Sequence, residues 1–196
     1  MEIYRVAKDE GKDLKKKMEA WYIKRTKNHV SLVQKYCKIA AKEFEEFEEL
    51  LERLTVHDDS KFEEPEMSPY VFITWKYKCQ DDDSLTFEDC NPPEDIDDLM
   101  HEATSHHITT NSHHPEFHAP NFSLNKEDRD AVPDKMVDAT SMPRLDVAEM
   151  VCDWCSVSEE RGNTPKSWAD MNVNKRWKFT KEQEDLIYEI IDTIWE

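Results

Sequence analysis

Residues 30–54 read VSLVQKYCKIAAKEFEEFEELLERL, and this stretch decides the fold class. Its apolar residues recur mostly at intervals of three and four positions, which is the period of an α-helix with one buried face. Alanine, glutamate, lysine and leucine dominate the stretch, and neither proline nor glycine interrupts it. The pattern predicts helix over residues 12–54, and a break near Lys27 and Asn28 would divide it into two helices.

The same features predict helices further along the chain. We expect helices over residues 95–109, 143–158 and 180–195, where start signals precede apolar bands of helical period. The stretch YVFITWKY at residues 70–77 is rich in aromatic and β-branched residues, which suits a strand, but a buried helix is favoured in an otherwise helical chain. Residues 78–93, 115–135 and 162–169 are expected to be loops. The sequence therefore predicts an all-α, single-domain fold over residues 1–196, with its motif-bearing core at about residues 29–154.

Composition excludes several classes of function. The 196 residues include only two glycines, so glycine-rich phosphate-binding loops are absent. A formal net charge of −18 argues against binding to duplex nucleic acid. Five cysteines, an odd number, and the lack of an apolar leader predict reduced thiols in the cytoplasm, which would be the host cytoplasm for a viral protein. No apolar run is long enough to span a membrane.

Two polar stretches carry the chemistry. VHDDSKF at residues 56–62 sets His57 beside Asp58, and SHHITTNSHHPEFH at residues 105–118 holds five of the eight histidines. Asp153 lies in the apolar stretch EMVCDWC, where a carboxylate needs a partner such as a metal ion. Imidazole and carboxylate together suit Mn, Fe, Co, Ni or Zn. We therefore predict that these stretches share one site for one or two divalent transition-metal ions.

These motifs resemble those of the HD-domain superfamily of metal-dependent phosphohydrolases. HDDSK is similar to the His-Asp-x-x-Lys signature of that superfamily, HHITTNSHHPE to its later His-His segment, and EMVCDW to the helix that brings its closing Asp. HVSLVQKY, HDDSKF, HHITTNSHHPEF and MPRLDVAEMVCDW together are similar to a group of bacterial and phage proteins with HD-like motifs. The resemblance covers about residues 29–154 and implies an HD-like helical bundle.

The resemblance also implies roles for individual residues. The implied metal ligands are His29, His57, Asp58, His106, His107 and Asp153, and Asp58 would bridge two ions. The implied reaction is hydrolysis of a small phosphate ester such as a nucleotide, by water that a metal ion activates. Asp58 would orient that water, Lys61 would neutralise phosphate charge, Asn111 would contact substrate, and His113 or His114 would protonate the leaving oxygen.

Several alternatives stay open. The spacing does not decide which histidines of residues 101–118 bind metal; His106 and His107 would face two different ions, and His113 and His114 either bind metal, contact substrate or stabilise a loop. His57 and Asp58 by themselves also suit helix caps. His118 is expected at the surface, and Cys152 and Cys155 are expected to be core residues and not a metal or redox pair. An HD-type diiron oxygenase and a non-catalytic HD-like binding module are the rival functions.

Overall fold

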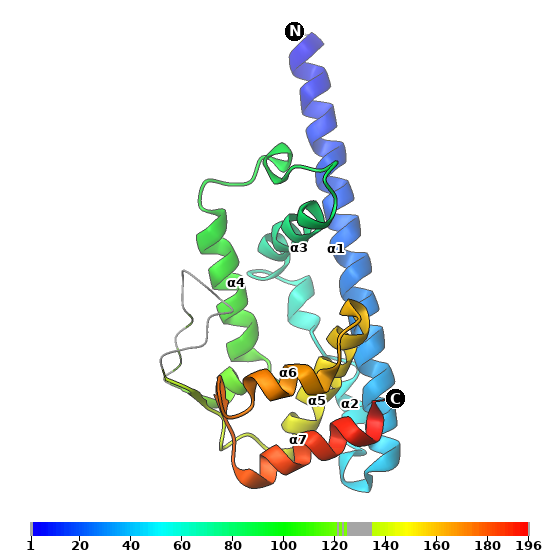
Figure 1. Cartoon of the computed structure of the whole chain (residues 1–196). Coiled ribbons are helices and arrows are strands. Elements are labelled where there is room, and N and C mark those ends of the chain that lie inside the picture. Colours follow the sequence, from blue (N-terminus) through cyan, green and yellow to red (C-terminus); the bar gives the residue numbers. More distant parts are fainter. Residues whose placement is uncertain (1, 121, 123, 125–134, 196) are drawn as a thin grey trace. The chain divides into compact units, whose positions relative to one another are not determined.

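The structure is a computed structural model that describes residues 2–120, 122, 124 and 135–195, with side chains described from residue 13 onward. The chain is mostly helical, which confirms the predicted fold class (Figure 1). Its elements, with η marking short 3-10 helices, are α1 Glu2–Glu43, η1 Glu45–Phe47, α2 Leu50–Arg53, η2 Asp59–Phe62, α3 Met67–Asp81, η3 Phe87–Cys90, α4 Ile96–Thr110, η4 Pro115–His118, β1 Val137–Asp138, α5 Arg144–Arg161, α6 Pro165–Asn172, β2 Trp177–Lys178 and α7 Lys181–Ile194.

The chain forms two compact units. The first comprises Met1–Lys27 and Ser60–His106, and the second comprises Asn28–Asp59 and His107–Glu196. The predicted single-domain organisation stays a prediction. The predicted helix break is wrong, because α1 runs through Lys27 and Asn28 without interruption. The helix predicted over residues 12–54 is wrong at its end, because α1 stops at Glu43 and only the short elements η1 and α2 follow. No proline or glycine stands near these two residues, so nothing local prevents the helix from continuing.

The first unit has its own small core. Its buried apolar residues come from α1, α3 and α4, and they are Met18, Tyr22, Tyr70, Val71, Trp75 and Ala103. The helix favoured for residues 70–77 is confirmed as part of α3. The predicted loop at residues 78–93 is partly wrong, because α3 continues to Asp81 and η3 forms a further turn at Phe87–Cys90.

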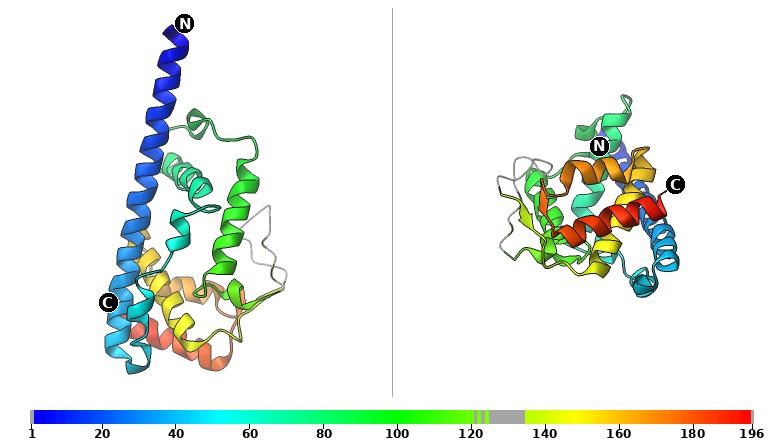
Figure 2. Two further views of the ribbon diagram at one scale, coloured as in Figure 1. Left: turned by 180° about the vertical axis from the view of Figure 1, so that it is seen from behind. Right: turned by 60° about the horizontal axis from the view of Figure 1, so that its bottom comes forward.

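The second unit is built around α5. Its residues Val147, Val151, Cys152 and Cys155 are fully buried, and α6 and α7 pack against α5 and against each other (Figure 2). The helix expected at residues 143–158 begins just after Pro143, which takes the N-cap position. It ends at Gly162, whose φ of 67° is the left-handed conformation that glycine adopts at low cost. The buried free thiols agree with the expected core role of Cys152 and Cys155.

Two helices follow α5, and one of them was not expected. The helix predicted at residues 180–195 is confirmed as α7, and Thr180 begins it with a complete capping box to Gln183. The predicted loop at residues 162–169 is wrong beyond its first turn, because α6 begins at Pro165. Thr164 caps α6 through its side chain, and Pro165 takes the first helical position, where the missing N–H is not needed.

The second unit also contains a two-stranded parallel sheet, formed by β1 and β2. Val137 pairs with Trp177 and Asp138 with Lys178. The predicted loop at residues 115–135 is wrong at its start, because Pro115 and Glu116 are buried in η4. Residues 121, 123 and 125–134 of that loop lie outside the described residues. Among the described residues, no helix is both long and apolar enough to cross a membrane.

Candidate metal centre

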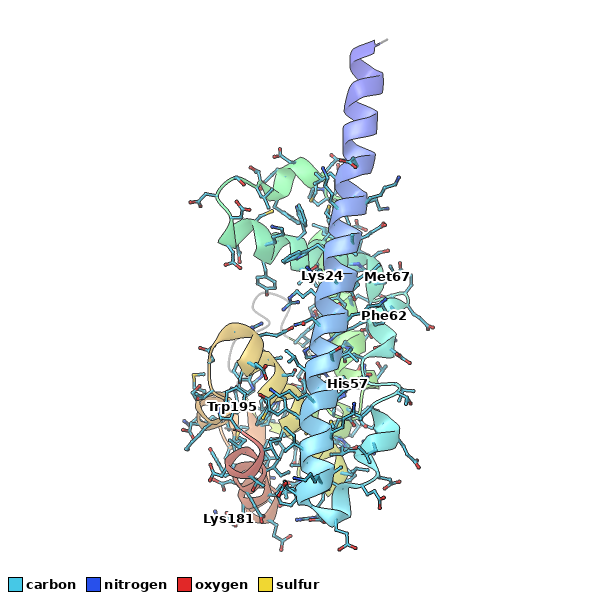
Figure 3. The ribbon with its side chains drawn as sticks, turned by 90° about the vertical axis from the view of Figure 1, so that its right-hand side faces the viewer. Lys24, His57, Phe62, Met67, Lys181 and Trp195 are labelled. Atoms are coloured by element: carbon cyan, nitrogen blue, oxygen red, sulfur yellow. The ribbon has the colours of Figure 1, made fainter. Side chains whose placement is uncertain are left out.

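The centre is built around the turn between α2 and η2, where Figure 3 labels His57. The backbone N–H of His57 donates to the carbonyl of Arg53, the last residue of α2, at 3.1 Å. Asp58 has a φ of 62°, a left-handed conformation that costs about 1 kcal/mol in most residues and is tolerated best by Asn and Asp. His57 and Asp58 are 4% and 1% exposed. The turn therefore buries both side chains of the predicted His-Asp pair.

One oxygen of Asp58 faces two histidines of different segments. Asp58 Oδ2 lies 3.2 Å from His29 Nε2 and 3.6 Å from His57 Nε2. Asp153, on α5, places Oδ1 3.0 Å from the same His29 Nε2. Four of the predicted ligands, from α1, the His57 turn and α5, thus converge on one point of the second unit.

The other oxygen of Asp58 faces a second set of histidines. Asp58 Oδ1 lies 3.4 Å from His107 Nε2 and 3.7 Å from His113 Nε2. The Nε2 atoms of His107 and His114 are 3.0 Å apart. His107 comes from the last turn of α4, and His113 and His114 follow that helix. The carboxylate of Asp58 therefore lies between two sets of imidazole nitrogens.

Polar partners lie behind two of these rings, at their Nδ1 atoms. Ser156 Oγ lies 2.9 Å from the carbonyl of Asp153, to which it can donate, and 3.1 Å from His29 Nδ1, so it can accept Nδ1–H of His29. Glu149 Oε1 accepts from His57 Nδ1–H at 2.8 Å. When both rings are neutral with the proton on Nδ1, Nε2 of each presents a lone pair towards Asp58, which is the form that binds a metal ion. Either a proton on Nε2 or a metal ion bound there supplies the positive charge that the neighbouring carboxylate oxygens attract.

The residues fit a metal ion. Three groups of side chains have donor atoms close enough to share an ion: His29, His57 and Asp58; His107, His113 and His114; and His57, His113 and Glu149. Donor atoms that share one ion at about 2.1 Å lie about 3.0–3.4 Å apart. The oxygens of Asp58 and Asp153 lie 3.0–3.7 Å from the nearest imidazole Nε2 atoms, which is close to this range. Within the described part of the chain, the buried Nε2 of His57 has no hydrogen-bond partner. Buried histidine and carboxylate groups could therefore hold a metal ion.

The carboxylates and imidazoles of the centre interact strongly with one another. Burial alone would raise the pKa of Asp153, but the hydrogen bond with His29 and the nearby imidazoles lower it far below its usual value. Burial lowers the pKa of His57, yet the carboxylates of Asp58, Glu149 and Asp153 outweigh burial and raise it. Burial and the neighbouring rings of His114 and His57 lower the pKa of His113 well below its usual value, so His113 is neutral near pH 7. A neutral imidazole is the form that binds metal.

Two of the predicted site residues, His106 and Lys61, belong to the first unit. His106 belongs to none of the three groups of potential ligands, and its Nδ1 lies 2.8 Å from Glu66 Oε1 in the first unit. Adjacent positions on a helix point about 100° apart, so His106 cannot face the same point as His107. Lys61 also belongs to the first unit, where its carbonyl accepts from Tyr22, and its predicted role towards substrate stays a prediction.

Two further predictions concern polar residues near the histidine pair His113-His114. The amide nitrogen of Asn111 lies 3.1 Å from His107 Nδ1 and donates to the His107 carbonyl at 2.8 Å, which gives Asn111 a contact with the candidate site itself. The expected surface position of His118 is wrong. Its side chain is 9% exposed, and Nε2 lies 2.9 Å from the carbonyl of Ser112 and 3.4 Å from Asp146 Oδ2.

Sequence reasoning missed the residues behind the histidines. Glu149 and Ser156 contact the rings of His57 and His29, and Arg53 binds Glu149. Glu149 carried one usable signal: like Asp153, it is a charged residue in the apolar band of α5, and its position one turn earlier puts both on one face. Ser156 and Arg53 carried no local signal.

Comparison with known proteins places the chain in a family. No curated protein and no solved structure matches it significantly. Residues 18–193 match the model of a family of unknown function, DUF5662, and this span includes every residue of the candidate metal centre. The chain belongs to the DUF5662 family.

Proposed function

We propose that this protein is an HD-type metal-dependent phosphohydrolase that acts on a small phosphate ester, with nucleotides as the first class of substrate to test. The observation that carries the proposal is the position of Asp58. One of its oxygens faces His29 and His57, and the other faces His107 and His113. A carboxylate with imidazoles on both sides is the arrangement that two neighbouring metal ions require from a bridging ligand.

The donor set divides into two halves. One ion would be held by His29, His57, Asp153 and Oδ2 of Asp58, and the second by His107, His113 and Oδ1 of Asp58. Nitrogen and oxygen donors without thiolate suit Mn, Fe, Co, Ni or Zn. When bound, such ions lower the pKa of a coordinated water towards about 7 and polarise a phosphoryl oxygen.

The side chains of this protein would perform the other steps. Asp58 would orient the attacking water, because its carboxylate is buried between the two halves. His114 would donate a proton to the leaving oxygen, because it lies beside His107 and is partly exposed. We assign His113 to metal binding in place of its predicted role as proton donor, since burial keeps this imidazole neutral.

Phosphate release from a panel of nucleotides and small phosphate esters tests the proposal. Purified protein would be stripped with a chelator and reloaded with Mn, Co, Ni, Mg or Fe(II). The double variant His57→Ala/Asp58→Ala is the inactive control, and Asp59→Asn, at an exposed neighbouring carboxylate, is the matched control. We expect release that depends on metal, vanishes in the double variant and persists in Asp59→Asn.

Protein that binds metal and releases no phosphate from any compound would overturn the proposal. Dioxygen consumption by the iron-loaded protein, with absorption in the near ultraviolet, would then identify a diiron oxygenase. Metal binding with neither reaction would identify a non-catalytic module.

A further inference from the structure

Arg53 is connected to His57 by two routes. Through the backbone, the carbonyl of Arg53 accepts the N–H of His57 at 3.1 Å. Through the side chain, Arg53 Nη1 donates to Glu149 Oε2 at 3.0 Å, and the other oxygen of Glu149 accepts from His57 Nδ1 at 2.8 Å. One residue at the end of α2 therefore holds both the main chain and the imidazole ring of His57.

A second carboxylate holds the guanidinium in place. Asp146 lies about one turn before Glu149 on α5, and it also accepts a hydrogen bond from Arg53 Nη1. The side chains of Asp146 and Glu149 are only 6% and 7% exposed, whereas that of Arg53 is 33% exposed. Buried carboxylates that share one guanidinium cannot rotate freely without leaving a charge unpaired. Glu149 is thereby restricted to one orientation, with Oε2 towards Arg53 and Oε1 towards His57.

Asp146 and Glu149, the two carboxylates that bind Arg53, also contact Ser112 and His113. Ser112 Oγ donates to Asp146 Oδ1 at 3.1 Å, and Ser112 directly precedes His113. Glu149 Oε1 also lies 3.7 Å from His113 Nδ1. The position of Glu149 behind His57 and His113 therefore depends on the ion pair with Arg53.

We propose that Arg53 is a positioning residue for the metal centre, which acts through Glu149 to keep the proton of His57 on Nδ1 and the lone pair of Nε2 directed at Asp58. The proposal rests on the metal binding in the proposed function, but it does not depend on the reaction catalysed. Partners of this kind that orient metal-binding histidines typically change metal affinity by about 10–100-fold when they are removed.

The proposal predicts that Glu149→Gln moves the ring proton of His57 from Nδ1 to Nε2. The amide of glutamine has one acceptor and one donor end, and Arg53 is a donor, so Arg53 selects the orientation with the amide oxygen towards itself. The NH2 group then faces His57 Nδ1 and donates to it, which moves the ring proton to Nε2. A protonated Nε2 cannot bind a metal ion.

Two measurements on the full chain test the proposal. The affinity for Co(II) is measured by competition with a chromophoric chelator. The protonated nitrogen of His57 is identified by ¹⁵N NMR of the metal-free protein at a pH above the raised pKa of His57, where the imidazole is neutral. Glu149→Gln should lower the Co(II) affinity about 10–100-fold and move the His57 proton to Nε2. Arg53→Lys, which keeps the charge but loses the planar geometry, should show a smaller loss of affinity.

The matched controls alter two residues of α5, the helix that carries Glu149. Arg144→Lys alters an exposed arginine that makes two hydrogen bonds with Glu46, and Glu159→Gln alters a carboxylate on α5 that binds Lys35 and Tyr36. Both controls should keep the wild-type affinity and the wild-type His57 signals. Equal losses in the controls, or unchanged affinity and tautomer in Arg53→Lys and Glu149→Gln, would overturn the proposal.

The outcomes separate this proposal from the proposed function. Wild-type protein without affinity for Co(II) would overturn both. Tight Co(II) binding that weakens in both Arg53→Lys and Glu149→Gln, together with no phosphate release from any substrate, would support the positioning role and overturn only the phosphohydrolase.

Discussion

Asp58→Asn should remove most of the stabilisation that metal ions give to this protein. Asparagine has the shape of aspartate and tolerates the left-handed backbone that residue 58 adopts, with a φ of 62°, so the change adds little strain. It removes the negative charge that lies between the two sets of imidazoles. The variant therefore tests the bridging carboxylate without disturbing the turn that positions it.

The size of the effect follows from mass action. At a metal concentration of about 100 times Kd, a ligand that binds only the folded state adds about 2.7 kcal/mol of stability. For a chain of this length, each kcal/mol raises Tm by about 2–4 °C, so the wild-type Tm should rise by about 5–11 °C. If the variant binds about 100-fold more weakly, the gain falls to about 0.4 kcal/mol and the shift to about 1–2 °C.

Thermal unfolding with and without Co(II) or Mn(II) measures both shifts, each against its own baseline in chelator. Asp59→Asn is the control, because it removes an exposed carboxylate from the adjacent position. A metal-dependent shift in Asp58→Asn as large as that of the wild type would refute the reasoning, since the ions would then bind without the central carboxylate.

Three further predictions concern other parts of the second unit. Ser156→Ala removes the acceptor of His29 Nδ1–H and should weaken Co(II) binding about 10-fold or more, as measured by chelator competition. Thr180→Ala removes the side-chain cap of α7 and should lower the free energy of unfolding by about 1 kcal/mol in urea titrations. Hydrogen bonds from Thr140 and an ion pair with Lys178 lower the pKa of Asp138 to about 2, so Asp138 contributes stability above its unfolded pKa that is lost as pH falls through about 2; NMR titration of its carboxyl carbon measures this pKa.

Each of these predictions has a control and a contrary result. Ser158→Ala alters another buried serine of α5, and equal metal affinity in both serine variants would contradict the role of Ser156. Thr193→Ala alters a hydroxyl within α7, and an equal loss of stability there would contradict the capping argument. A pKa near 4 for Asp138 would show that its partners do not hold the carboxylate in solution.

The helical elements could be predicted because their signals are local. The apolar period is followed by one helix over residues 30–43 and not over residues 44–54, and the capping box at Thr180 acts within the first turn of α7. The errors fall where the signal was weak or distant. Thr164 and Pro165 form a start signal for α6 that is only two residues long and lies within the predicted loop at residues 162–169. β1 and β2 pair residues forty positions apart, which no local pattern reveals.

The candidate site also has some features that the sequence could predict and others that it could not. The residue types and their order pointed to His29, His57, Asp58 and Asp153 as ligands, because imidazole and carboxylate side chains are costly to bury without a cation. The choice between the adjacent residues His106 and His107 could not be made from sequence. It depends on which face of α4 points towards each neighbouring segment, and the structure pairs His106 with Glu66.

The sequence by itself determined the helical class and the chemical character of the centre, since both depend on residue types and on periods within one segment. Tertiary structure alone decided that Asp58 lies between two sets of imidazoles, that Glu149 and Ser156 orient the rings, and that Arg53 holds Glu149. These contacts join residues up to 127 positions apart, such as Ser156 and His29. Such pairs meet only after α1, the His57 turn and α5 have packed together, and no local preference of the chain specifies which side chains they bring into contact.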